Sequence, residues 1–322
     1  MKSFENKVAA ITGAGSGMGR TLAMSLARRG CNLALSDVNV AGLAETAKLA
    51  AGHGVKITTS RVDVGDRARV YAWAEEVVRD HGRCNLVFNN AGVSYGATVE
   101  GAEYPDFEWL MRINFWGVVH GTKAFLPHLR ASGDGHVVNT SSLFGLLSFP
   151  GQSAYNASKF AVRGFTECLR QELEITSAPV SATCVHPGGI KTNIARASKV
   201  HASLADLGVK DVEGSREEFE RMFHVTAEEA AEIILRGVEG NARRVLVGAD
   251  AKAYDVMQRL MPTAYQWILA KVAKRFMARA PGKKPPAPAT TIPRSPAASP
   301  SPALADLKVA SSHGADPHPP VQ

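Results

Sequence analysis

Residues 7–19 read KVAAITGAGSGMG, an apolar run followed at once by a glycine-rich turn. The apolar run is typical of a buried β-strand, and the residues after the turn have the spacing of an amphipathic helix. Gly13, Gly17 and Gly19 allow a tight turn and let backbone N–H groups approach a phosphate at the helix N-terminus. The order of strand, glycine-rich turn and helix therefore predicts a dinucleotide-binding turn.

The alternation of short apolar runs and longer helical patterns continues through the first 250 residues. Strands are expected at 7–12, 32–37, 57–64, 85–92, 136–142, 181–188 and 244–248. Helices are expected at 18–30, 66–81, 104–131, 155–176 and 227–240. Strands that alternate with helices form a parallel sheet covered by helices on both faces. The pattern predicts one α/β domain at 1–250, with a doubly wound Rossmann-type sheet of about seven strands.

The chain changes character after residue 250. Residues 251–280 are interpreted as a helical amphipathic extension, in which 263–279 place apolar positions along one helical stripe among lysines and arginines. Those apolar positions are Tyr265, Ile268, Leu269, Val272 and Phe276. The stripe fits a weak contact with an anionic membrane surface, or packing on the same domain or a neighbouring subunit, and its narrowness favours packing. Residues 281–322 are rich in Pro, Ala and Ser and are predicted to form a disordered tail, because they bury too little apolar surface.

Composition argues against several classes of protein. The net charge of +7 comes from residues 251–322, which hold ten Lys and Arg against three Asp, so the neutral body indicates no nucleic-acid groove. The four cysteines show no CxxC spacing and the ten histidines no HxxxH or HExxH spacing, so neither a disulfide framework nor a metal site is expected. There is no apolar run typical of a signal peptide or a membrane span. These features favour a cytoplasmic protein, with peripheral membrane contact as an open alternative.

Asp37 closes the second predicted strand, 18 residues after Gly19. A carboxylate at this place accepts hydrogen bonds from the adenosine ribose and repels a 2′-phosphate, which favours NAD over NADP. The alternative is that Asp37 caps the end of the strand. Arg20 is the one nearby cation, and we interpret it as a residue of the helix surface.

Tyr155 and Lys159 lie four residues apart in SAYNASKF, residues 153–160. On a helix this spacing places both side chains on one face. By itself the pattern fits a surface Tyr beside a Lys. A free Tyr has a pKa of about 10, and a neighbouring cation favours the phenolate, so the pair also fits an acid/base group at neutral pH.

Taken together, the motifs resemble the short-chain dehydrogenase/reductase family over residues 5–250, in its branch of roughly 250 residues. The turn at 12–19 matches the family pattern TGxxxGxG, and Tyr155 and Lys159 match its YxxxK. Ser142 precedes Tyr155 by 13 residues, the usual interval in the family. The other matching segments are NNAG at 89–92, Asp63 in VDV, Asn114 in RINFWG and PGGIKT at 187–192.

The resemblance implies the catalytic residues Ser142, Tyr155, Lys159 and Asn114. Tyr155 would be the general acid/base, Lys159 would favour its phenolate and hold the nicotinamide ribose, and Ser142 would bind the substrate oxygen. Asn114 would anchor a water that links Lys159 to solvent, although taken alone it is better read as a helix-bend or capping residue.

The resemblance also implies the dinucleotide-binding residues. They are Gly13, Ser16, Gly17, Met18, Gly19, Asp37, Asp63, Val64, Asn90, Ala91, Gly92, Tyr155, Lys159, Pro187, Gly188, Ile190 and Thr192. Thr192 would bond the nicotinamide carboxamide, and it also fits an N-cap of a following helix. NADP-dependent relatives usually carry Lys or Arg where this chain has Ser16 and Val38, which again favours NAD.

The predicted function is NAD(H)-dependent interconversion of a secondary alcohol and a ketone. The substrate is expected to be apolar, because Leu143, Phe144, Leu146, Leu147 and Phe149 follow Ser142, and because the covering segment 193–225 contains Leu204, Leu207, Val209, Phe219, Met222 and Phe223. These residues equally fit simple packing of the covering segment. The alternatives are an NADP(H)-dependent carbonyl reductase and a catalytically silent nucleotide-binding scaffold. By resemblance, a homodimer or homotetramer pairing through 104–131 and 155–176 is expected.

Overall fold

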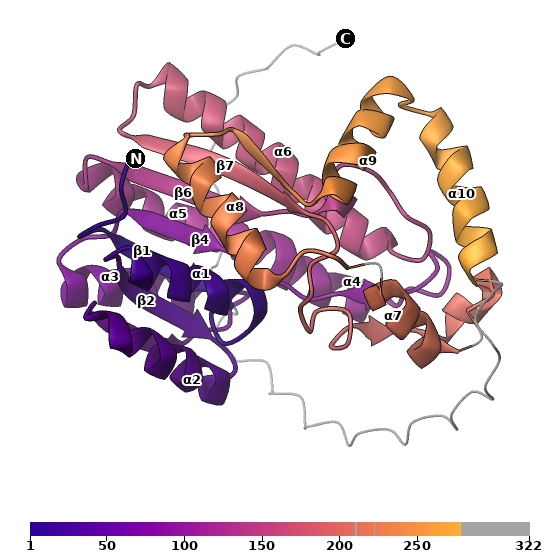
Figure 1. Ribbon diagram of the computed structural model, residues 1–322, viewed down its shortest axis with the longest axis horizontal. Coiled ribbons are helices and arrows are strands. Elements are labelled where there is room, and N and C mark those ends of the chain that lie inside the picture. Colours follow the sequence, from indigo (N-terminus) through magenta and orange to yellow (C-terminus); the bar gives the residue numbers. More distant parts are fainter. Residues whose placement is uncertain (210, 222, 278–322) are drawn as a thin grey trace, which may run out of the picture. The chain divides into compact units, whose positions relative to one another are not determined.

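The computed structural model describes residues 1–209, 211–221 and 223–277. Within these residues, seven parallel strands form one sheet in the order β3-β2-β1-β4-β6-β7-β9. The strands are β1 (Val8–Thr12), β2 (Asn32–Asp37), β3 (Ile57–Arg61), β4 (Leu86–Asn89), β6 (Gly135–Thr140), β7 (Val180–Pro187) and β9 (Arg244–Val247). The chain winds outward from β1 to β3, returns to β4 beside β1, and then winds in the other direction (Figure 1). This confirms the predicted doubly wound α/β sheet.

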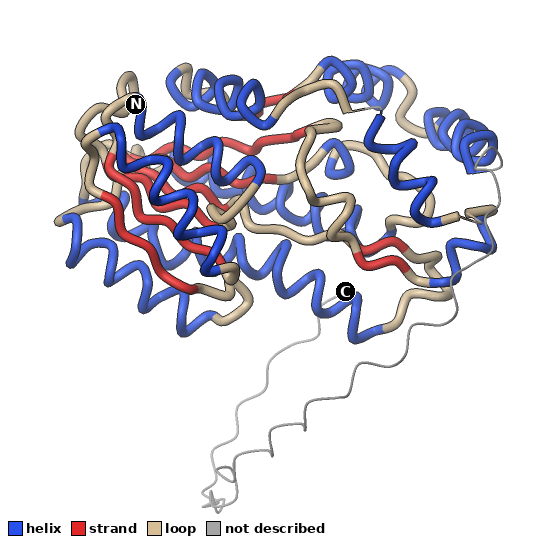
Figure 2. The backbone as a smooth tube through the Cα atoms, turned by 60° about the horizontal axis from the view of Figure 1, so that its bottom comes forward, coloured by secondary structure: helices blue, strands red, loops and turns tan. Residues whose placement is uncertain are grey.

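Helices cover both faces of the sheet (Figure 2). They are α1 (Gly17–Arg28), α2 (Val40–Ala50), α3 (Arg67–His81), α4 (Tyr104–Met111), α5 (Gly117–Ala131), α6 (Ser153–Ile175) and α8 (Ala227–Glu239), with single turns at Ala51–His53 (η1) and Leu143–Gly145 (η3). Neighbouring strand residues alternate between two cores, since Ala9 and Ile11 pack with α1, α2 and α8, whereas Val8 and Ala10 pack with α3, α5 and α6. Helix α2 lies outside the predicted set.

Three predicted strands end at least two residues earlier than expected. β3 ends at Arg61 rather than 64, β4 ends at Asn89 rather than 92, and β6 ends at Thr140 rather than 142. Asp63 and the last residues of NNAG therefore lie in loops beyond the carboxyl ends of their strands, at the edge where open α/β sheets bind ligands.

A small second pair of parallel strands lies apart from the main sheet. It joins β5 (Tyr95–Gly96) to β8 (Lys199–Val200) and is followed by η4 (Ala202–Leu207) and α7 (Val212–Arg221). This pair connects the loop after β4 to the segment expected to cover the substrate.

The extension forms helices α9 (Ala249–Leu260) and α10 (Ala264–Met277). Tyr265 and Leu269 of α10 pack with Leu143 and Leu147, which follow the predicted catalytic Ser142. Val272 was expected to pack with the rest of the apolar stripe, and this is wrong. Its side chain is 49% exposed, and Ala273, one position further, is buried instead. The Phe276 side chain and the predicted disordered tail at 281–322 lie outside the described part of the structure. Over residues 1–209, 211–221 and 223–277, no helix has the length and apolar character needed to span a membrane.

Candidate active site

The glycine-rich turn between β1 and α1 adopts backbone conformations that favour glycine. Gly13 and Gly17 have φ angles of +67° and +50°, at which a side chain is strained. A Cβ on Gly13 would lie 2.9 Å from the Cα of Ala91, and a Cβ on Gly17 would lie 3.3 Å from the methyl carbon of Thr192. Gly19 sits behind the turn, where a Cβ would overlap the Gly13 carbonyl oxygen. Because these glycines have no side chain, the turn can lie close to the loops after β4 and β7.

A cleft of about 290 Å³ opens beside this turn. It collects most of the predicted dinucleotide-binding residues, namely Gly13, Ser16, Gly17, Met18, Asp37, Asp63, Val64, Asn90, Ala91, Gly92 and Thr192. They meet because the loops at the carboxyl ends of parallel strands share one edge of the sheet. Gly19, Pro187, Gly188, Ile190, Tyr155 and Lys159, also predicted to contact the dinucleotide, are not among the described residues that line this cleft.

Helix α1 begins at the cleft without a capping side chain. Its N-cap residue Ser16 makes no side-chain hydrogen bond to the first turn, and that turn contains no acidic residue. The first N–H groups of a helix have no intrahelical partner and attract anions. Because Ser16, Gly17 and Met18 line the cleft, the N-terminus of α1 fits the pyrophosphate of a dinucleotide.

Asp37 lies at the end of β2 with both carboxylate oxygens bonded to backbone. Oδ2 accepts a hydrogen bond from the Gly15 N–H at 2.8 Å, and Oδ1 accepts one from the Asn39 N–H at 2.9 Å. Asp37 therefore does cap the strand end, and it lines the cleft as well. Arg20 bridges α1 and α2 rather than lying on a free helix surface, since its guanidinium donates to the Gly15 carbonyl and to Glu45.

The NNAG segment ties β4 to its two neighbouring strands. The Thr12 hydroxyl oxygen accepts hydrogen bonds from the N–H groups of Asn90 and Ala91, each at 3.0 Å. The Asn89 amide donates to the Asn139 side chain at 2.8 Å, inside the buried core. These bonds hold the floor of the cleft between β1 and β6.

Ser142, Tyr155 and Lys159 converge at the carboxyl end of β6. Tyr155 and Ser142 are joined by a side-chain hydrogen bond. The Lys159 Nζ donates to the Thr140 carbonyl oxygen at 3.0 Å and lies 5.6 Å from the centroid of the Tyr155 ring. A Cβ on Gly92 would lie 3.5 Å from the same Nζ, so Lys159 reaches the wall of the cleft without lining it.

Burial governs the ionisation of Tyr155 and Lys159. It lowers the pKa of Lys159 to about 8, because the ammonium group is removed from water. It also raises the pKa of Tyr155 above 10, and the hydrogen bond with Ser142 opposes that rise. The neighbouring Lys159 was expected to lower the pKa of Tyr155. The pKa is raised instead, because loss of hydration outweighs the hydrogen bond.

Asn114 occupies a single π-helical turn, η2 (Arg112–Trp116), which separates α4 from α5 within the predicted helix 104–131. Its amide donates to the Val93 carbonyl at 2.9 Å and accepts from the Val93 N–H at 2.8 Å. The same amide donates to the Ser158 hydroxyl at 3.2 Å. Such turns are frequent at functional sites. Asn114 thus lies at an irregular turn of the helix, and its amide fixes the loop that follows NNAG.

The loop after β7 is held by β9 and by the first turn of α9. The Gly188 N–H donates to the Val247 carbonyl at 2.9 Å, and the Gly189 N–H donates to the Asp250 carboxylate at 2.7 Å. Ile190 is buried and forms a bridge with Val225. Pro187, Gly188 and Ile190 therefore support this loop from behind. Asp250 is a site residue that sequence reasoning missed, because its partner lies 61 residues away along the chain.

Two further predictions change in detail. Residues 193–197 form turns rather than a helix, so the alternative that Thr192 caps a following helix is wrong. The Asp63 carboxylate forms an ion pair with Arg112 at 3.0 Å and accepts from the Gly65 N–H at 2.9 Å. Asp63 is therefore held at the edge of the cleft by partners that its sequence motif does not include.

The apolar residues after Ser142 pack mainly with the C-terminal extension. Leu143 and Leu147 form a cluster with Tyr265 and Leu269 of α10, and Phe144 packs against it, whereas the packing alternative concerned the covering segment. Phe144 also meets the Tyr155 ring nearly at a right angle, with ring centroids 6.2 Å apart. From the covering segment, Leu204 approaches Gly151, where a Cβ would lie 2.9 Å from its methyl carbon. Phe219 and Met222 have side chains outside the described part of the structure.

These features can be compared with known proteins. A family model described as short chain dehydrogenase matches residues 7–202, which include the glycine-rich turn, Ser142, Tyr155 and Lys159. The chain belongs to the short-chain dehydrogenase/reductase family. As a member, it is an NAD(P)-dependent oxidoreductase that acts on CH–OH donors.

The similarity to named relatives extends over most of this chain and most of each relative. SadH, a Mycobacterium tuberculosis protein named as an oxidoreductase, is 51% identical over 277 residues, covering 86% of this chain and 98% of SadH. Human estradiol 17-beta-dehydrogenase 11 is 30% identical over 279 residues, covering 85% of this chain and 86% of that protein. The crystal structure of a short-chain dehydrogenase/reductase from Burkholderia phymatum in complex with NAD has a TM-score of 0.75 at 30% identity, covering 82% of this chain and 97% of that one.

Proposed function

We propose that this protein uses NAD(H) to interconvert a secondary alcohol and a ketone on an apolar substrate, with Tyr155 as the general acid/base. The observation that carries the proposal is the convergence of Ser142, Tyr155 and Lys159 beside a cleft whose turn, helix N-terminus and Asp37 fit a dinucleotide. A bound oxidised nicotinamide would accept hydride and add positive charge near Tyr155.

In the proposed reaction, Tyr155 Oη removes the hydroxyl proton of the alcohol while Ser142 hydrogen-bonds the same oxygen and positions it. Lys159, as a cation 5.6 Å from the Tyr155 ring, favours the phenolate as the proton arrives. Its pKa of about 8 keeps a large protonated fraction at neutral pH. Asn114 would connect Lys159 to solvent through a water, a role that we carry over from the family.

NAD is proposed over NADP because a 2′-phosphate would meet the Asp37 carboxylate at the cleft wall. Arg20 offers no compensating charge, since its guanidinium is already bonded to Glu45 at 2.8 Å. The alternative NADP(H)-dependent carbonyl reductase requires Asp37 to turn away from the ribose. A catalytically silent scaffold is disfavoured by the presence of all three groups, Ser142, Tyr155 and Lys159.

An apolar substrate is supported by Phe144, whose ring packs at a right angle to the Tyr155 ring. The human relative that is named an estradiol dehydrogenase is consistent with an apolar alcohol as the class of substrate.

We also propose a homodimer or homotetramer that pairs through α5 and α6, because Trp116 beside α5 is 51% exposed and Phe160 on α6 is 38% exposed. The proposed location is the cytoplasm, supported by four free cysteines. Packing of Tyr265 and Leu269 on the domain supports the packing interpretation of the α10 stripe over contact with a membrane surface.

The test is a fluorescence titration with NADH and NADPH, followed by turnover on a panel of apolar secondary alcohols. Tyr155→Phe should lower kcat by about 100- to 10,000-fold, the usual contribution of a positioned acid/base, with the NADH Kd retained. Tyr71→Phe, on the exposed side of α3, is the matched control. Near-normal turnover of Tyr155→Phe would remove Tyr155 as the acid/base, and a lower Kd for NADPH than for NADH would overturn the assignment of Asp37.

A further inference from the structure

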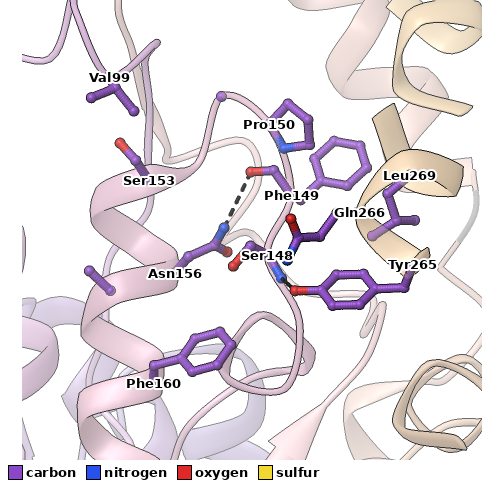
Figure 3. Close-up of a pocket in the computed structure, with 12 residues that line it drawn as sticks. Val99, Ser148, Phe149, Pro150, Ser153, Asn156, Phe160, Tyr265, Gln266 and Leu269 are labelled. Atoms are coloured by element: carbon purple, nitrogen blue, oxygen red, sulfur yellow. Dashed lines mark hydrogen bonds between the residues drawn. The ribbon is translucent and has the colours of Figure 1, made fainter. Parts of the chain in front are cut away.

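Helix α10 packs on the segment that follows Ser142, a contact that the function proposed above does not use. Tyr265 and Leu269 of α10 are buried in one cluster with Leu143 and Leu147. Figure 3 shows the Tyr265 ring extending from α10 toward the loop after η3. The family model ends at residue 202, so similarity to the family assigns no role to this helix.

The position of Ser142 depends on the turn η3, which begins beside it. Ser142 is the N-cap of this turn, and its hydroxyl oxygen accepts a hydrogen bond from the Phe144 N–H at 3.1 Å. Its carbonyl oxygen accepts another from the Gly145 N–H at 2.9 Å. Leu143 is the next residue in the chain, and its side chain belongs to the cluster with α10. A shift of η3 would therefore carry the Ser142 hydroxyl with it.

Tyr265 holds this segment near both of its ends. Its ring packs with Leu143 and Leu147, and its hydroxyl oxygen accepts a hydrogen bond from the Ser148 N–H at 3.4 Å, drawn as a dashed line in Figure 3. This distance is longer than usual for an N–H···O bond, so the bond is weak. Packing of the aromatic ring therefore provides most of the contact between α10 and the segment.

Phe144 extends the contact from α10 to Tyr155. It packs against the same cluster, and its ring meets the Tyr155 ring at 87° with centroids 6.2 Å apart. Phe149, the next residue after Ser148, stacks on Phe144 with centroids 5.7 Å apart. Both the hydroxyl group and the aromatic ring that lie next to Tyr155 are thus supported by α10.

We propose that Tyr265 is a positioning residue for the reaction. It holds Ser142 and Phe144 against Tyr155, in the arrangement in which one alcohol oxygen reaches both the Ser142 hydroxyl and Tyr155 Oη. This role rests on the proposed function, which makes Ser142 and Tyr155 the groups that contact the substrate oxygen. Small misplacements of such groups lower rates by large factors. NADH binding should not depend on Tyr265, since no described residue of α10 lines the dinucleotide cleft.

The first test is the turnover of an apolar secondary alcohol, expressed as kcat per NADH-binding site. Tyr265→Ala should lower this kcat at least tenfold and leave the NADH Kd unchanged. A merely structural role would reduce the number of binding sites and not the kcat of each site. Tyr265→Phe keeps the ring and should stay within about threefold of wild type, because only a weak hydrogen bond is lost. Trp267→Ala, on the exposed side of α10, is the matched control and should leave kcat unchanged.

The second test is amide hydrogen exchange on the full chain, which needs no substrate. Peptides covering residues 142–149 should exchange at least tenfold faster in Tyr265→Ala than in wild type, because the Phe144 and Ser148 N–H groups are no longer held in place. Peptides covering the glycine-rich turn at 12–19 should exchange at the same rate in both proteins. If Tyr265→Ala does not fold, Leu269→Ala removes part of the same cluster and takes its place in both tests.

Unchanged exchange over residues 142–149 would overturn the proposal, as would an unchanged kcat per site in Tyr265→Ala. Equal losses of kcat in Tyr265→Ala and Trp267→Ala would also overturn it, because only Tyr265 faces the segment after Ser142. Absence of alcohol turnover in the wild-type protein would instead contradict the proposed function. In that case hydrogen exchange would still decide whether Tyr265 holds the segment that carries Ser142.

Discussion

His186 couples the acid stability of this protein to the segment after β6 that carries Ser142. The residue is fully buried in β7, and its Nδ1 lies 2.9 Å from the Ser142 carbonyl oxygen. Because that carbonyl only accepts, Nδ1 carries the hydrogen. Burial lowers the pKa of His186 to about 4, and the hydrogen bond to Ser142 opposes the decrease. The folded protein therefore holds this imidazole neutral at pH values where a free histidine is protonated.

This difference in pKa sets the direction and size of the expected effect. In the unfolded chain the His186 pKa is about 6.5, so its stabilising contribution is complete above pH 6.5. As the pH falls from 6.5 toward 4, the unfolded state takes up a proton that the folded state excludes, and the free energy of unfolding decreases. A pKa lowered from 6.5 to about 4 corresponds to about 3 kcal/mol.

The perturbation is His186→Asn, in which the amide nitrogen replaces Nδ1 as donor to the Ser142 carbonyl and nothing titrates. Urea unfolding at pH 7.5 and pH 4.5 should show that wild type loses about 2–3 kcal/mol more than the variant between these pH values. His136, whose pKa burial lowers to about 3, is present in both proteins, so its contribution cancels in the comparison. If both proteins lose the same free energy of unfolding between these pH values, the neutral, buried His186 does not reduce stability in acid, and the argument is refuted.

Three further predictions concern the cleft and its supports. Asp37→Ser should weaken NADH binding about tenfold and shift the NADH/NADPH affinity ratio toward NADPH, and an unchanged ratio would contradict its proposed contact with the ribose. Gly17→Ala, at φ +50°, should lower the free energy of unfolding by about 1 kcal/mol and weaken NADH binding, whereas Gly164→Ala on α6, with open space around it, should do neither. Asp250→Ala should lower the free energy of unfolding by about 1 kcal/mol and raise KM more than Asp250→Asn, which keeps an acceptor for the Gly189 N–H. Equal behaviour of the two Asp250 variants would show that the loop after β7 does not depend on this bond.

Local patterns predicted the fold well. The strand, glycine-rich turn and helix at residues 7–30, and the alternation that follows, depend on residues close together in the chain, and the sheet order confirms them. The interval between Ser142 and Tyr155 and the spacing of Tyr155 and Lys159 are likewise local. The structure places these three side chains together because α6 packs on β7 and η3.

Contacts between distant segments could not be predicted from local sequence patterns. The bond from Gly189 to Asp250, the ion pair of Asp63 with Arg112, and the packing of Tyr265 against Leu147 join residues tens of positions apart. No short pattern encodes them, because each depends on how whole elements are placed in space.

Like these contacts, the burial of each side chain is decided only by the tertiary structure. The sequence by itself determined the doubly wound sheet, the glycine-rich turn and the set of chemical groups at the site, since these follow from residue type and short-range spacing. The tertiary structure decided that Tyr155 has a raised pKa and that Val272 is exposed while Ala273 is buried. Hydration and hydrogen bonding depend on all neighbours of an atom in space, and most of those neighbours are remote in the sequence.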